Sequence, residues 1–98
     1  MIEVRETPHY ADWFAALRDI QAKARILVRI RRLSLGNAGD AKSVGDGVRE
    51  MRIDYGPGYR VYFTGRGETL VILLAGGDKR TQDRDISKAH ELAKGLKL

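Results

Sequence analysis

The spacing of apolar residues changes near residue 48, and this change restricts the fold more than any other feature of the sequence. Before it, apolar side chains recur at intervals of three and four residues, which is the period of an amphipathic helix. After it, they alternate with polar residues or run continuously, which is typical of strands. A chain of 98 residues has room for a single domain with one modest core. We therefore predict one α+β domain over residues 1–98, in which a helical part precedes a small sheet.

The start of the chain predicts a short strand followed by a helix. Residues 2–5 alternate between apolar and charged side chains, as strand residues do. Thr7 then provides an N-cap, and Pro8 stands at the first helical position, where its missing N–H is not needed. Four apolar residues of this helix share one face and should enter the core: Tyr10, Trp13, Phe14 and Leu17.

A second helix is predicted from about Ile20 to Leu35, with Asp19 as its N-cap and Gly36-Asn37 as its terminator. The two helices should form a hairpin. The apolar arc expected to cover the core includes Ile20, Ala24, Leu27 and Ile30. The opposite side carries Arg25, Arg29 and Arg32, a row that is either a solvated helix face or a contact surface for an RNA backbone.

The second half of the chain predicts three strands and a closing helix. After a glycine-rich loop with room for a brief extended segment, residues 48–55 alternate as a half-buried antiparallel strand does. Residues 59–64 return, and residues 69–75 are nearly all apolar, which indicates a central strand covered on both faces. A helix over 82–96 closes the fold, with Asp83 and Asp85 in its first turn and Lys94 and Lys97 near its end. The expected order is β-α-α-β-β-β-α, a helical hairpin packed on an antiparallel-rich sheet with a C-terminal helix.

The composition favours a polyanionic partner and removes several kinds of catalytic site. The net charge is +5, and twelve of the 18 basic residues are arginine, whose guanidinium matches phosphate oxygens. With zero cysteines there is no disulfide and no thiolate zinc site. His9 and His90 stand on separate predicted helices, and the carboxylates are scattered, so neither a triad nor a two-metal nuclease is expected. We expect no metal and no cofactor.

The N-terminus is acidic and short of apolar residues, so it does not resemble a signal peptide, and no apolar run is long enough to cross a membrane. The cytoplasm is therefore the expected location.

Residues 74–86 are the most informative segment for function, because an apolar strand passes through two glycines into a basic turn and then a helix. Lys79 and Arg80 stand just before the helix, where free N–H groups and the helix dipole attract anions. Arg84, one turn further, either belongs to this phosphate site or pairs with a neighbouring carboxylate such as Asp83.

Arg60 belongs to a second cationic segment, residues 49–60, which can lie beside the first if both share a sheet. Because it alternates with Tyr59 and Val61, it should point away from the core and act as a phosphate clamp. The alternative is a solvated arginine that pairs with Asp54 or Glu50 across the hairpin.

Such a cationic site suits cleavage of RNA by its own 2′-hydroxyl. Arginines stabilise the charge that develops on the phosphorane. They do not accept a proton at neutral pH, because the guanidinium pKa lies above about 12. The base must then be another group.

Three segments, Leu35–Asp40, Arg49–Phe63 and Gly76–Ile86, resemble the HigB-like "addiction module killer protein" branch of the RelE/ParE toxin superfamily. The resemblance covers essentially the whole chain. It implies a microbial RNase-like fold and a type II toxin that cuts mRNA in the ribosomal A site. It also implies a cognate antitoxin that silences the toxin as a hetero-oligomer, commonly a helix-turn-helix protein encoded next to it.

The resemblance also assigns site residues by motif position. Arg60 matches the strand arginine placed on the scissile phosphate, and Arg80, with Lys79 beside it, matches the arginine after the last strand. Arg52 falls near strand positions that carry a lysine pair in RelE. Those lysines are absent here, and so is the C-terminal tyrosine, since the last tyrosine is Tyr62. Glu50 and Asp83 are the candidates for the missing base.

Two other functions stay open at this point. A ParE-like toxin would bind and poison DNA gyrase without cutting RNA, with the same fold and the same pairing with an antitoxin. A degenerate domain would survive only as an antitoxin-bound partner in DNA binding.

Overall fold

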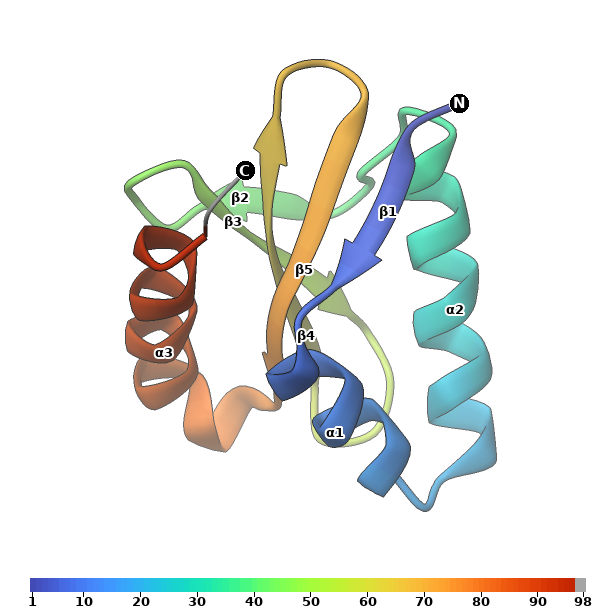
Figure 1. Ribbon diagram of the computed structural model, residues 1–98. Coiled ribbons are helices and arrows are strands. Elements are labelled where there is room, and N and C mark those ends of the chain that lie inside the picture. The colour runs from blue at the N-terminus through green and yellow to red at the C-terminus, as the bar shows by residue number, and fades with distance from the viewer. Residues whose placement is uncertain (97–98) are drawn as a thin grey trace.

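The computed structural model describes residues 1–96 and contains a five-stranded mixed sheet with helices on both faces (Figure 1). The elements follow the order β1 (Glu3–Glu6), α1 (Pro8–Ala16), α2 (Ile20–Ser34), β2 (Ala41–Ser43), β3 (Val48–Ile53), β4 (Tyr59–Arg66), β5 (Leu70–Gly77), the short 3₁₀ helix η1 (Lys79–Thr81) and α3 (Gln82–Lys94). The strands are arranged as β1-β5-β4-β3-β2. The predicted α+β class is confirmed, and the extended segment in the loop is the edge strand β2.

Local signals in the sequence place the helix boundaries. The Thr7 hydroxyl accepts a hydrogen bond from the backbone N–H of Tyr10, and Pro8 begins α1. Asp19 caps α2 by accepting from the N–H groups of Gln21 and Ala22. The first turn of α3 is acidic and its last turn basic, as predicted, although Lys97 lies outside the described residues.

The sheet has a core on each face. Helices α1 and α2 cover one face, while α3 covers the other, so that Figure 1 shows them on opposite sides of the strands. Strand β5 is buried on both faces, as predicted. Strand β3 is also covered on both faces, because Val48 packs beneath α3 while Met51 and Ile53 face α1 and α2. The prediction of a half-buried strand was therefore wrong.

The buried side of α2 also differs from the prediction. The side chains in the core are Ala22, Ile26 and Leu33, with Ile30 packed against them, whereas Ile20 and Leu27 face solvent. The helix carries two apolar stripes, and periodicity alone did not decide which of them meets the sheet. The second stripe is left uncovered.

The first strand joins the sheet through a long-range contact. β1 runs parallel to β5, with Glu3 opposite Leu70 and Glu6 opposite Leu73, while the other neighbouring strands are antiparallel. The N–H of Ile2 also bonds the carbonyl of Ser34 at the end of α2, at 2.8 Å. Within residues 1–96, no helix is both long enough and apolar enough to cross a membrane.

Candidate functional site

The predicted cationic residues after β5 lie where strands β3, β4 and β5 approach one another. Arg60 stands opposite Arg52 on one side and opposite Gly77 on the other. The N–H of Lys79 reaches the carbonyl of Pro57, in the turn between β3 and β4, at 3.4 Å. The sheet thus brings the two cationic segments of the sequence to one end of the molecule.

A hollow of about 380 Å³ opens at η1 and the first turn of α3. The side chains of Arg80 and Arg84 are 82% and 78% exposed, so both guanidiniums are accessible to a ligand. Asp83 lies in the same hollow and is exposed. The lining residues are Lys79, Arg80, Thr81, Gln82, Asp83 and Arg84.

Asp78 caps η1 and occupies part of the terminus that the sequence suggested for an anion. Its carboxylate accepts the Arg80 backbone N–H at 2.8 Å and the Arg80 Nη2 at 3.2 Å. Burial acts to raise the pKa of Asp78, but these bonds from Arg80 outweigh it and lower that pKa. An anion in the hollow must therefore be held mainly by side chains, because one of the expected N–H groups is already bonded.

The two glycines before the turn allow close packing against β5. A Cβ on Gly76 would lie 2.1 Å from Cε3 of Trp13, and one on Gly77 would lie 1.7 Å from Oδ2 of Asp85. Both glycines belong to β5, so the motif lets α1 and the start of α3 approach the strand. Asp85 in turn accepts a hydrogen bond from the Thr81 hydroxyl.

Arg60 is buried beneath the α3 side of the sheet and does not project into solvent. It points away from the core that Val61 enters, as predicted, but its residue exposure is only 9%. Its Nε lies 3.7 Å from Oε2 of Glu50, and within residues 1–96 this Nε has no hydrogen-bond partner. Arg60 is buried because α3 also covers this face of β4, and its role as a phosphate clamp stays a prediction. The pairing with Glu50 is observed, but the arginine is not solvated as the alternative interpretation supposed.

Glu50 is the centre of a buried polar network. It accepts hydrogen bonds from Gln82 at 2.8 Å and from Tyr62 at 3.0 Å. Its carboxylate also forms ion pairs with Arg52, Arg60 and Lys42. Burial acts to raise the pKa of Glu50, but the bonds from Gln82 and Tyr62 and the charge of Arg60 outweigh it and lower that pKa.

This environment argues against Glu50 as a general base. A carboxylate with no exposed surface and a lowered pKa binds protons weakly and cannot reach an RNA hydroxyl. Of the two carboxylates predicted as bases, Asp83 is the one that lies in the hollow.

Gln82 and Tyr62 were missed as members of this network. Tyr62 stands opposite Glu50, and Arg60 opposite Arg52, so the period of two along the hairpin places all four on one face. That signal was available in the sequence once the register was known. Gln82, the first residue of α3, offered no such signal, because its contact with Glu50 depends on how the helix docks.

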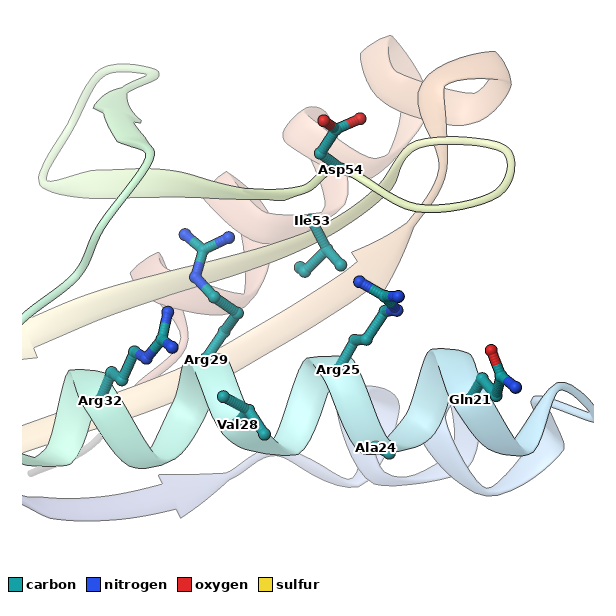
Figure 2. A pocket seen from close by; sticks show the side chains of 8 residues that line it. All are labelled: Gln21, Ala24, Arg25, Val28, Arg29, Arg32, Ile53 and Asp54. Carbon is teal, nitrogen blue, oxygen red and sulfur yellow. The ribbon is translucent and has the colours of Figure 1, made fainter.

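The arginines of α2 are not part of the hollow, because they lie on the α1–α2 side of the sheet (Figure 2). Arg29 donates to the backbone carbonyls of Arg52, Ala38 and Asp40, which fixes the loop before β2 to the helix. Arg25 stacks over the Tyr55 ring, 4.6 Å from its centroid.

Two comparisons place the chain among known proteins. Residues 12–94 match the family described as phage-derived protein Gp49-like (DUF891). An uncharacterized protein of Haemophilus influenzae is 52% identical over 97 residues, which cover 99% of this chain and 98% of the relative. Both matches span the hollow, the Glu50 network and α2.

Proposed function

The chain belongs to the Gp49-like family, a RelE/Gp49 toxin-like family, and on that premise we propose that it is the toxin of a type II toxin–antitoxin system. Its proposed activity is metal-independent cleavage of mRNA on the ribosome. The observation that carries this proposal is the hollow at η1, where Lys79, Arg80 and Arg84 surround an exposed carboxylate. A cationic hollow with a carboxylate in it provides charge stabilisation and a base side by side.

In the proposed reaction, Asp83 removes the proton of the ribose 2′-hydroxyl, and the 2′-oxygen attacks the adjacent phosphorus. The bond to the 5′-oxygen breaks, leaving a 2′,3′-cyclic phosphate, and the departing 5′-oxygen takes a proton from water to become a 5′-hydroxyl. Arg80 and Lys79 stabilise the negative charge of the phosphorane from the rim of the hollow.

The Glu50 network supports this arrangement from behind the hollow. Arg60 and Arg52 add positive charge close to the hollow, while Glu50 and Gln82 fix Arg60 relative to the first turn of α3. We propose that these four residues position the groups of the hollow and add to its positive potential, without touching the 2′-hydroxyl that Asp83 deprotonates. The positive charge of the whole chain, +5, favours docking on ribosomal RNA.

The test is to add the protein to a translating extract with a defined mRNA and to map new 5′ ends by primer extension. Arg80→Ala is the informative variant, because its side chain is 82% exposed and its loss should leave the fold intact. We expect about a hundredfold slower cleavage, the usual effect of removing one donor that stabilises a transition state. Arg31→Ala, an exposed arginine on α2, is the matched control and should cut at the wild-type rate.

Two results would overturn the proposal. The first is cleavage by Arg80→Ala at the rate of Arg31→Ala, with both variants folded by circular dichroism. The second is an intact mRNA combined with accumulation of relaxed plasmid in a purified gyrase supercoiling reaction, which would establish the ParE-like alternative.

A further inference from the structure

The outer stripe of α2 is an apolar surface that nothing in residues 1–96 covers. Ile20, Leu27, Val28 and Leu35 are 81%, 54%, 50% and 60% exposed. Within α2, Ile20, Leu27 and Val28 share one face with Ala24, opposite the residues that enter the core. Leu35 follows at the C-cap, and the exposed Arg31 lies on the same face between Val28 and Leu35. Scattered exposed leucines are ordinary, but several exposed apolar residues gathered on one helix face indicate an interaction surface.

A groove runs beside this stripe, between α2 and the end of β3 (Figure 2). Its volume is about 600 Å³, and Ala24, Val28 and Ile53 form its apolar part. Val28 belongs to both features, so groove and stripe form one continuous surface, which we call the α2 surface. With 15 residues, α2 offers a length of about 22 Å, enough for a partner helix of some four turns.

The edge of this groove is positively charged. Arg25, Arg29 and Arg32 line it and are opposed there by one carboxylate, that of Asp54. Across the described part of the chain, neither Arg25 nor Arg32 takes part in an ion pair. Arg25 is held over Tyr55, whose hydroxyl donates to Asp19 at 3.0 Å. The guanidinium of Arg25 is thus held in place beside the apolar floor.

We propose that the α2 surface binds an acidic amphipathic helix of a partner protein. The apolar face of that helix would cover Val28 and Leu27, and its carboxylates would pair with Arg25 and Arg32. A second copy of this chain fits poorly, since two arginine-lined grooves would repel each other. RNA could pair with the arginines of the groove, but the apolar floor has no group that binds a phosphate. The inference holds whether or not the protein cuts RNA.

The experiment uses a synthetic fluorescein-labelled helical peptide of the length of α2, with leucines on one face and glutamates on both flanks. A second peptide replaces each glutamate with lysine and keeps the leucines. Fluorescence anisotropy with the full chain should give at least about tenfold tighter binding for the acidic peptide. Arg32→Ala and Val28→Ser should each weaken that binding about three- to tenfold, while Arg66→Ala, an arginine near α3, should not change it.

Three alternatives to an acidic partner helix give distinct results, and each of these results would contradict the inference. Equal binding of the two peptides, no binding, or indifference to Arg32→Ala and Val28→Ser would show that the α2 surface is not such a site. Dimers in sedimentation that Val28→Ser dissociates would assign it to a second copy. Displacement of the peptide by single-stranded RNA, with RNA binding weakened by Arg32→Ala, would assign it to nucleic acid. None of these readouts depends on mRNA cleavage, so they are separable from a failure of the nuclease proposal.

Discussion

At the scale of single residues, Glu50 combines two properties that rarely occur together, complete burial and full charge. The energy of burying a carboxylate is offset here by two hydrogen bonds and three cations from β2, β3 and β4. Because the cations outnumber the carboxylate, the cluster keeps a positive charge behind the hollow. The same arrangement makes Arg60 a residue of the interior, so removing it should destabilise the fold as well as any activity.

Replacing Glu50 by glutamine should destabilise the protein near neutral pH. The change leaves three cations around a neutral group, and the loss of one partner of a buried pair usually costs about 3 kcal/mol. Since the pKa of Glu50 is lowered on folding, its contribution is complete above its ordinary value of 4.5 and is lost as the pH falls toward the folded-state pKa. Urea unfolding at several pH values should show the two proteins converging in acid.

Glu68→Gln is the control for this substitution, because Glu68 is an exposed residue of the turn between β4 and β5. Its unfolding free energy should match the wild type at every pH. A Glu50→Gln protein as stable as Glu68→Gln at pH 7 would contradict a charged, stabilising Glu50.

At the scale of elements, the end of β5 fixes the position of both helical layers. Trp13 of α1 packs on Gly76, and Asp85 of α3 packs on Gly77, so closely that a Cβ at either position would force a neighbouring group to shift. Adjacent residues of a strand face opposite sides of the sheet, so each glycine receives one helix. The hollow at η1 follows directly after this point, and its geometry depends on the packing there.

Gly76→Ala should destabilise the protein by roughly 3 kcal/mol, because the new methyl group overlaps the Trp13 ring and one element must shift. Gly65→Ala is the matched control, since its Cβ would meet nothing closer than 3.9 Å. Adding Trp13→Ala to Gly76→Ala should cost less than the sum of the two single changes in urea unfolding. Additive effects would show that the two residues do not compete for the same space.

At the scale of the whole molecule, the sheet separates two positively charged regions. Helix α3 covers one face of the sheet and α2 the other (Figure 1). The hollow is lined by η1 and the first turn of α3, whereas the arginine-lined groove is formed by α2 and the end of β3. One region is lined by polar side chains alone, whereas the other has an apolar floor. Their chemistry therefore suits two different partners.

The salt dependence of RNA binding tests this separation. Binding of a labelled single-stranded RNA should weaken as KCl rises, and Arg80→Ala should reduce the slope of log K against log salt by about 0.7, one phosphate contact. Arg32→Ala removes the same charge from the α2 surface and should leave the slope unchanged. Equal reductions in the two variants would mean that RNA contacts both faces of the sheet.

Much of the architecture could be predicted, because it depends on signals local to the chain. Thr7, Pro8 and Asp19 fix the helix starts, and the apolar run of β5 marks a central strand. The predictions that were wrong concern burial, which depends on contacts between elements. The docking of α3 buries Glu50 and Arg60, and the choice between two stripes on α2 is made by the sheet, which no residue of that helix encodes by itself.

In the candidate site too, features set by local signals could be predicted, whereas features set by contacts between elements could not. The cationic turn at Lys79 and Arg80 was readable from the sequence, since exposed charge after a strand needs no tertiary contact to be recognised. The meaning of Gly76 and Gly77 was not, because a glycine required by a tryptophan from another helix looks the same as one required by a phosphate. The role of Gln82 was invisible for a similar reason.

The parallel pairing of β1 with β5 has a consequence for synthesis of the protein. β1 cannot pair with β5 until residues 70–77 have emerged from the ribosome, so this part of the sheet stays open while the intervening segments are made. Until then the emerging chain lacks both β5 and the turn that follows it. A product that ends before residue 77 therefore has no assembled hollow.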